Sequence, residues 1–93
     1  MARTFVVKAS FQRAYDRLAS AERDRVKKSL EQLRHYLQSG EAPLGLGVKR
    51  LGPGVYEFRA GLALRGVYID EGNRLVLTLL GSHDEVRRFL KRS

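Results

Sequence analysis

Two arginines and one histidine stand out as residue types that suit chemistry on a phosphodiester. Arg59 and Arg65 lie on either side of a glycine turn in the stretch Y-E-F-R-A-G-L-A-L-R-G-V-Y, and His83 follows a hydrophobic segment in L-L-G-S-H-D-E-V-R-R-F. Arginine forms two parallel hydrogen bonds to a phosphate, and histidine exchanges a proton near neutral pH. We expect the two arginines on neighbouring strands and the histidine at the end of a third.

The first 42 residues predict one strand and two helices. Residues 4–8 predict the strand, because all of them except Lys8 are β-branched or aromatic. Ser10 is predicted to cap a helix whose apolar residues recur at helical spacing: Phe11, Ala14, Tyr15 and Leu18. Ser20 is predicted to cap a second helix, which ends at Gly40 and carries this apolar stripe: Val26, Leu30, Leu33 and Leu37. The two helices form a hairpin over one face of a sheet, with the charged residues 22–28 on its solvated outer side.

After Pro43 the sequence changes from the helical period to the period of strands. A strand or loop is expected over 44–51, followed by strands at these positions: 55–60, 64–70 and 74–80. Ser82 and Glu85 form the S-x-x-E pattern of a capping box, which predicts a last helix through Arg92. The fold class is therefore α+β: an N-terminal strand and helical hairpin, then a largely antiparallel sheet and a short C-terminal helix. We expect one domain over residues 1–93.

Alternation along the strands predicts which side chains share a face. Tyr56 and Phe58 should point toward the helices, which leaves Glu57 and Arg59 on the other, open side. Arg65 has the parity of other residues on its strand, Val67 and Ile69, so its placement beside Arg59 stays open. His83 would begin the last helix, where a helix N-terminus favours a bound anion.

Composition favours a polyanion as partner. The 93 residues carry a net charge of +8, and arginine outnumbers lysine, which suits forked contacts to phosphate or carboxylate. Without cysteine the chain has no disulfide or thiolate site, and His35 and His83 lie far apart, so we expect neither metal nor cofactor. No apolar run is long enough for a membrane span. These features predict a cytoplasmic protein that does not bind membranes.

The order of elements, the Y-x-F-R and L-R-x-V-Y strand pair and the closing G-x-H-x-x-V-x-x-F resemble the RelE/ParE superfamily of toxin–antitoxin toxins. The resemblance covers nearly the whole chain. It implies a toxin of a type II system that is neutralised by a cognate antitoxin. RelE-like members are ribosome-dependent endoribonucleases that cut mRNA without metal, and ParE-like members inhibit gyrase without catalysis.

The resemblance also implies roles for individual residues. Arg59 matches a basic strand position, and Arg65 matches the arginine that binds the reacting phosphate. His83 falls where RelE has an arginine, but other ribosome-dependent relatives have a histidine that acts as the general acid. Glu57 stands where RelE has a lysine, and Phe89 stands roughly where it has a tyrosine. The trio Glu57, Arg65 and His83 is therefore more similar to the relatives that use histidine.

In such a site His83 would serve as acid, Arg65 would stabilise the phosphate charge and Glu57 would serve as base. Lys49 and Arg50 join Arg59 as candidates to bind the RNA backbone. Each role has a simpler alternative. His83 can be an exposed residue in a helical turn, and Glu57 can simply neutralise Arg59 on the same face. Lys49 and Arg50 can remain solvated. A gyrase inhibitor and a relative that only binds RNA or antitoxin also stay open.

Overall fold

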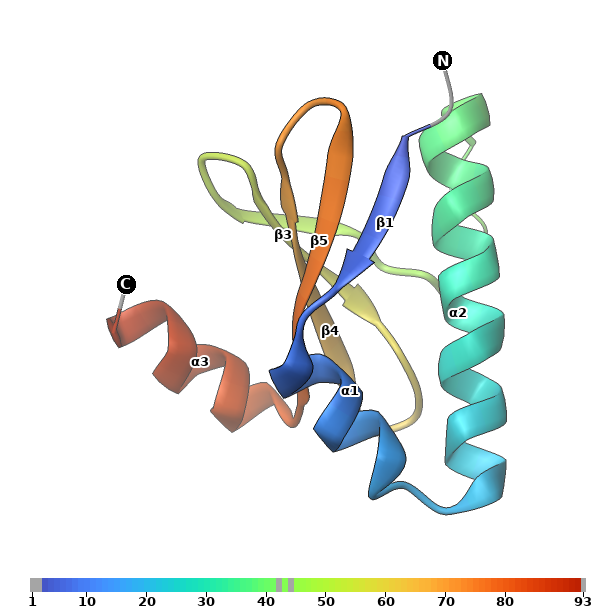
Figure 1. Ribbon diagram of the computed structural model, residues 1–93, viewed down its shortest axis with the longest axis vertical. Helices are drawn as coiled ribbons and strands as arrows, with labels where there is room; N and C mark the ends of the chain where they lie inside the picture. The colour runs from blue at the N-terminus through green and yellow to red at the C-terminus, as the bar shows by residue number, and fades with distance from the viewer. Residues whose placement is uncertain (1–2, 42, 44, 93) are drawn as a thin grey trace.

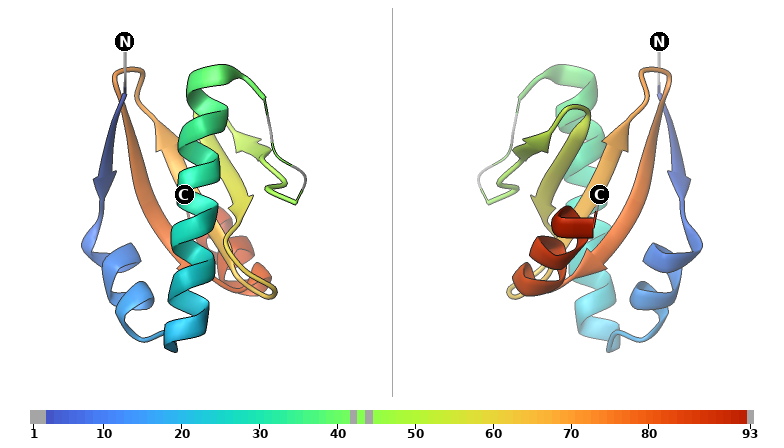
Figure 2. Two further views of the ribbon diagram at one scale, coloured as in Figure 1. Left: turned by 90° about the vertical axis from the view of Figure 1, so that its right-hand side faces the viewer. Right: turned by 90° about the vertical axis from the view of Figure 1, so that its left-hand side faces the viewer.

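The computed structural model describes residues 3–41, 43 and 45–92. In this part of the chain the elements are, in order, β1 (Thr4–Val7), α1 (Ala9–Asp16), α2 (Ser20–Ser39), β2 (Lys49–Gly52), β3 (Val55–Arg59), β4 (Arg65–Asp70), β5 (Arg74–Gly81) and α3 (His83–Arg92). Figure 1 shows α2 standing beside the sheet. The two views of Figure 2 place α2 and α3 on opposite faces of that sheet. The predicted α+β class, with its helical hairpin and short last helix, is confirmed.

The strands form one sheet in the order β1-β5-β4-β3-β2. β1 runs parallel to β5, and the other neighbouring pairs are antiparallel. The predicted largely antiparallel sheet is therefore confirmed. β5 lies between β1 and β4, which agrees with its nearly continuous apolar sequence, because an interior strand covered on both faces needs apolar side chains on both.

The main core lies between the sheet and the hairpin of α1 and α2. Its fully buried apolar side chains are Phe11, Val26, Leu33, Leu46, Phe58, Ala60, Tyr68, Leu75, Leu77 and Leu80. The predicted stripe of α2 is confirmed, since Leu30 and Leu37 pack against the same cluster while half-buried. The helix ends where predicted, at Gly40, whose φ of 81° lies in the left-handed region and whose N–H donates to the Tyr36 carbonyl at 2.7 Å.

The two predicted serine caps of the hairpin are wrong. Lys8 and Ala19 occupy the N-cap positions of α1 and α2, and neither cap has a side-chain hydrogen bond. Ser10 lies inside the first turn of α1, and its hydroxyl donates to the Thr78 carbonyl at 2.7 Å. Ser20 is already the first residue of α2. The Ser10 hydroxyl thus ties α1 to β5 instead of capping its own helix.

A β-bulge interrupts the ladder between β4 and β5. Tyr68 of β4 pairs with Leu77, whereas the preceding residue Val67 pairs with Leu79, so Thr78 is an extra residue in the ladder. Such a β-bulge reverses the facing of the residues that follow it. Leu80 therefore returns to the core side occupied by Leu77.

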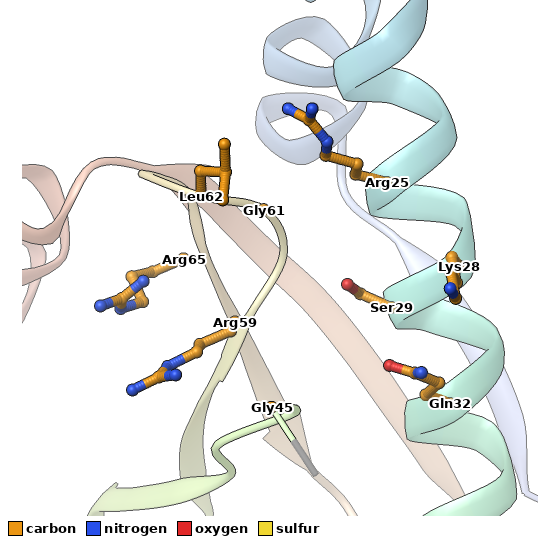
Figure 3. Close-up of a pocket in the computed structure, with 9 residues that line it drawn as sticks. All are labelled: Arg25, Lys28, Ser29, Gln32, Gly45, Arg59, Gly61, Leu62 and Arg65. Carbon is orange, nitrogen blue, oxygen red and sulfur yellow. The ribbon is translucent and has the colours of Figure 1, made fainter. Parts of the chain in front are cut away.

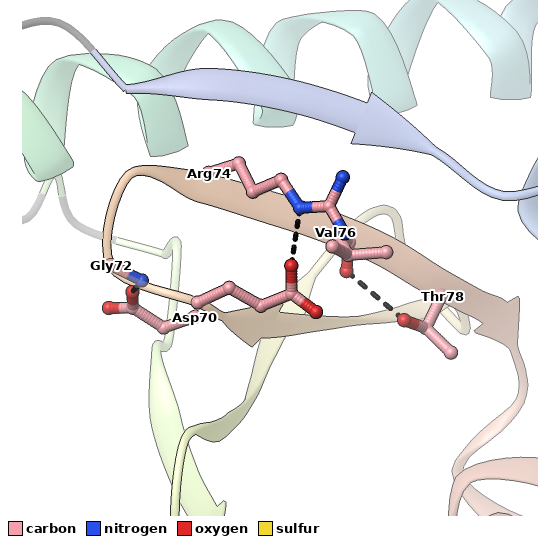
Figure 4. A network of polar contacts seen from close by, with 6 residues as sticks. Asp70, Gly72, Arg74, Val76 and Thr78 are labelled. Carbon is pink, nitrogen blue, oxygen red and sulfur yellow. Dashed lines mark hydrogen bonds and ion pairs between the residues drawn. The ribbon is translucent and has the colours of Figure 1, made fainter.

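Polar contacts fix the turn between β4 and β5 (Figure 4). The Gly72 N–H donates to the Asp70 carboxylate at 2.9 Å, and Arg74 pairs with Glu71 across the turn. Arg3, just before β1, donates to the other oxygen of Asp70 at 2.8 Å. The Gly72 N–H, followed by the Arg3 guanidinium, holds the pKa of Asp70 below its ordinary value, against the opposite effect of burial.

Candidate functional site

The face of the sheet opposite α2, called the open face below, brings the two arginines together. Arg59 of β3 lies directly opposite Arg65 of β4, and Arg65 in turn pairs with Gly81 of β5. Residues directly opposite in neighbouring strands have side chains on the same face. The question that alternation left open is therefore settled: Arg59 and Arg65 are neighbours. Because adjacent like charges repel, this pair favours a bound anion.

Glu57 holds one of these arginines in place. It lies two residues before Arg59 and therefore shares the open face, and only 7% of its surface is exposed. Its Oε1 atom is 3.7 Å from the Nε atom of Arg65. The ion-pair partner of Glu57 is thus Arg65, whereas the simpler interpretation had expected Arg59. Lys49 of β2 lies directly opposite Glu57 and adds a third cation to this face.

His83 begins α3, and the predicted capping box that places it there is confirmed. The Ser82 N–H donates to Glu85 Oε1 at 3.0 Å, and the Glu85 N–H donates to Ser82 Oγ at 3.2 Å. Gly81 leaves room for this box, since a Cβ there would lie 2.9 Å from the Glu85 carboxylate carbon and would displace the carboxylate. His83 is exposed and follows Gly81 by two residues. It therefore lies at the end of the sheet where Gly81 pairs with Arg65.

One of the predicted site residues, Arg50, lies apart from this group. Arg50 pairs with Tyr56, a residue of the core side, so its side chain does not share the open face, and its Nε donates to the Gly52 carbonyl at 3.3 Å. Phe89 of α3 lies half-buried beside a hollow of about 350 Å³ that Leu79 also lines. The open face thus contains Lys49, Glu57, Arg59 and Arg65, but not Arg50.

A hollow of about 560 Å³ adjoins the arginine pair and was missed from the sequence. It is lined by Arg25, Lys28, Ser29, Gln32, Gly45, Arg59, Gly61, Leu62 and Arg65 (Figure 3). The sequence pattern had placed Arg25 and Lys28 on the solvated outer side of the helical hairpin. A signal was available in the sequence of α2. The four α2 residues that line the hollow, at positions 25, 28, 29 and 32, recur at helical spacing i, i+3, i+4 and i+7 beside the apolar stripe. What that stripe of polar residues would face depends on the position of the turn between β3 and β4.

The residues that the structure describes contain no group of three or more histidine, cysteine, aspartate or glutamate side chains that could hold a metal ion. Over the same residues, no helix is both long enough and apolar enough to cross a bilayer. The reactive groups that lie together at this end of the sheet are guanidinium, carboxylate and imidazole side chains.

The arrangement combines groups that bind phosphate with a carboxylate and an imidazole, which are groups that exchange protons. Arg59 and Arg65 present two adjacent guanidinium groups, which bind oxyanions through paired hydrogen bonds. Glu57 lies at the base of this pair, and His83 lies on the helix that begins beside it. An anion bound between them would relieve the repulsion of the two arginines.

No protein-family model matches the sequence, and no curated protein is significantly similar to it. Solved structures nevertheless share its fold. A mutant E. coli RelE toxin in the free state has a TM-score of 0.67 at 22% identity, covering 99% of this chain and 98% of its own. The Staphylococcus aureus YoeB dimer has a TM-score of 0.68 at 19% identity, covering 89% and 99%. RelE from Methanococcus jannaschii, solved with its antitoxin RelB, has a TM-score of 0.67 at 15% identity, covering 90% and 96%.

This chain has the RelE/ParE-like fold. The fold predicted from the strand pair and the closing helix motif is thereby confirmed over almost the whole chain. Among these toxins the RelE/ParE-like fold occurs both free and bound to an antitoxin. At such low sequence identities the likeness concerns the arrangement of the elements, and the roles of individual residues depend on this chain's own geometry.

Proposed function

We propose that this chain is the toxin of a type II toxin–antitoxin system and that it cleaves mRNA on the ribosome without a metal ion. The observation that carries the proposal is the register of β3, β4 and β5. It sets Arg59 against Arg65, with Glu57 paired to Arg65, at the end of the sheet where His83 begins α3.

The RelE/ParE-like fold supports the assignment as a toxin, since the three structural neighbours described above are toxins, one of them in a complex with its antitoxin. We propose a cognate antitoxin as the protein partner of this chain. The net charge of +8 supports a polyanionic target as well. RNA within the ribosome combines that charge with the phosphodiester that the arginine pair suits.

The proposed reaction assigns one role to each side chain. The 2′-oxygen of a nucleotide attacks the neighbouring phosphorus while Glu57 accepts the hydroxyl proton. Arg65, with Arg59 beside it, stabilises the extra negative charge on the phosphate oxygens. His83 donates a proton to the 5′-oxygen as its bond to phosphorus breaks. The products are a 2′,3′-cyclic phosphate and a 5′-hydroxyl, and Lys49 binds the RNA backbone on the open face.

Cell-free translation with mapped mRNA ends tests this function. The wild-type protein should produce cuts within ribosome-bound message. His83→Ala and Glu57→Gln should each slow cleavage by about 10²–10⁴-fold, the usual contribution of one catalytic proton transfer. Arg65→Ala should slow it by a similar factor, about that of a lost donor to a developing oxyanion.

The chain offers matched controls for two of these variants. His35→Ala removes the other histidine, exposed on α2, and Arg74→Ala removes a strand arginine with its own carboxylate partner at the far end of β5. Both should cleave like the wild type. Intact message together with blocked DNA supercoiling would replace the proposal with gyrase inhibition. No effect in either assay, with tight binding to a small protein encoded alongside, would leave only a binding role.

A further inference from the structure

The hollow between α2 and the turn joining β3 to β4 is cationic. Four of the residues that line it carry positive charge, namely Arg25, Lys28, Arg59 and Arg65. None of the described residues that line it is acidic. Glu22 borders a smaller, adjoining hollow that shares Arg25, Gly61 and Leu62 with this one. A concave surface with charges of one sign concentrates its field and attracts the opposite charge.

Most of the cations of this hollow form no ion pair with a carboxylate of the described residues. Within the described part of the chain, Arg25, Lys28 and Arg59 have no carboxylate within 4.0 Å, and only Arg65 has one, Glu57. Charges of one sign that share a concave surface without counter-charges repel one another. The arrangement is therefore more stable with an anion bound than without one.

The other residues of the hollow add polar groups and an apolar contact. Ser29 and Gln32 extend from α2 into the space between the helix and the sheet (Figure 3). Leu62 lies in the turn with 86% of its surface exposed, so its apolar side chain is accessible to a ligand in the hollow. Phosphate-binding cations beside an exposed apolar side chain match the two halves of a nucleotide, its phosphate and its base.

The hollow is continuous with the open face. Arg59 and Arg65 line it, and their side chains extend away from α2 (Figure 3). The register of β3 against β4 places both of them on the open face, with Glu57. A strand whose phosphate lies on this arginine pair can therefore pass around the end of β3 into the hollow. Continuity with the candidate reaction site favours RNA over an acidic protein segment as the occupant.

We propose that this hollow is a second nucleotide site, which binds a flanking nucleotide of the same single-stranded RNA that the open face cleaves. Arg25 and Lys28 each bind one of the two phosphates that flank it, and Leu62 packs against its base. The inference rests on the proposed function for the identity of the strand. It adds α2 and the turn between β3 and β4 to the substrate-binding surface.

The test measures binding of a fluorescent 2′-O-methyl RNA oligonucleotide, which lacks the attacking hydroxyl, across a range of salt concentrations. Each lost phosphate contact to a single strand lowers the salt slope by about 0.7. Arg25→Gln/Lys28→Gln should therefore lower the slope by about 1.4 and weaken binding by roughly 10- to 30-fold at 0.1 M salt. Leu62→Ser should weaken binding by about 3- to 10-fold and leave the slope unchanged, because it removes apolar contact but no charge.

The matched control is Arg17→Gln/Lys27→Gln. It removes one arginine and one lysine, both exposed, that do not line the hollow. The proposal is overturned if both double variants lose the same slope, since the net charge alone would then explain binding. It is also overturned if the wild type does not bind the oligonucleotide, or if Arg25→Gln/Lys28→Gln binds it normally while losing affinity for ribosomes or for an acidic antitoxin.

This readout is independent of cleavage. Oligonucleotide binding that depends on Arg25 and Lys28, together with intact message in cell-free translation, would support the second nucleotide site and reject the nuclease. Thermal unfolding of each variant, monitored by circular dichroism, should match the wild type, because the substituted side chains are exposed.

Discussion

Gly66 has no side chain, which lets β3 and β4 pack closely next to the arginine pair. Gly66 of β4 lies directly opposite Phe58 of β3, and the Phe58 ring covers the glycine on the core side. A Cβ on Gly66 would lie only 2.3 Å from the Cζ atom of that ring. The next pair along these strands is Arg59 with Arg65, so this close contact also influences the spacing of the two strands at the candidate site.

We predict that Gly66→Ala destabilises the protein by about 1–3 kcal/mol, the usual cost of overpacking a core. The Phe58 ring is fully buried and cannot move aside without disturbing its neighbours. Urea unfolding monitored by circular dichroism measures the change. Gly52→Ala is the matched control, because a Cβ there would meet nothing within 4 Å and should change stability by less than about 0.5 kcal/mol. Equal stabilities for the two variants would contradict the packing argument.

Residue types along one strand could be read from the sequence, but contacts between strands could not. Alternation correctly placed Glu57 and Arg59 on one face, because the period of a strand is local. The facing of Arg65 relative to Arg59 depended on the register of β3 against β4, which Gly66 and Phe58 help to fix. The choice of Arg65 as the partner of Glu57 follows from that register.

At the scale of elements, α3 depends on its cap to present His83. Its first turn is closed by the reciprocal hydrogen bonds between Ser82 and Glu85, and Val86 is its one fully buried side chain among the described residues. A helix of ten residues is marginal without such support. The cap is therefore a large part of what orders the start of α3.

We predict that Ser82→Ala costs about 1 kcal/mol, as the loss of an N-cap side chain usually does. The loss should appear first in α3, as faster amide hydrogen exchange in its first turn. Ser20→Ala is the matched control, because Ser20 stands at the start of α2 without capping it. Its effect should stay below about 0.5 kcal/mol. Equal exchange in α3 for the wild type and Ser82→Ala would show that packing alone holds the helix.

The three serine caps show which element boundaries a sequence can define. The capping box of α3 was predicted correctly, since both of its partners lie within four residues. Ser10 was misassigned because its hydroxyl finds an acceptor in β5, at Thr78, which is distant in sequence. The bulge at Thr78 was missed for a related reason: pairing with β4 defines it, and an apolar run looks the same with or without an extra residue.

At the scale of the whole molecule, Tyr68 makes the stability of the fold depend on pH in the alkaline range. It is buried between the sheet and α2, and its ring stacks on Tyr56 with the ring centroids 5.3 Å apart. Burial, followed by the nearby Tyr36 and Tyr56, raises the pKa of the Tyr68 phenol well above its ordinary value of 10.0. In the unfolded chain the same phenol loses its proton near pH 10.

We predict that the free energy of unfolding decreases as the pH rises above about 10. Below that pH the phenol is neutral in both states, and above it only the unfolded state releases the proton, so ionisation favours unfolding. Tyr68→Phe should be much less sensitive to pH over this range, while Tyr15→Phe keeps the wild-type decrease. Urea titrations between pH 8 and 11.5, limits chosen to bracket roughly the ordinary tyrosine pKa, measure both. A wild-type decrease that persists in Tyr68→Phe would assign it to other groups.

The cationic hollow also belongs to this scale, which is why the sequence did not predict it. Arg25 and Lys28 are separated from Arg59 and Arg65 by more than thirty residues, and only the packing of α2 on the sheet brings them together. The composition indicated a polyanion as partner. The surface that would bind it required knowledge of which helix face adjoins the turn between β3 and β4.

Because β1 pairs with β5, the sheet cannot be completed until the last strand has been synthesised. Thr4 pairs with Arg74 and Val7 with Leu77, so the first strand to be synthesised waits for the last one. At roughly 5–20 residues per second, that wait lasts about 4–14 seconds. The helical hairpin can form meanwhile, but Arg65 has no Gly81 beside it and α3 does not exist. A nascent chain therefore carries no assembled candidate site, and any activity would begin only after nearly all of the described chain has been made.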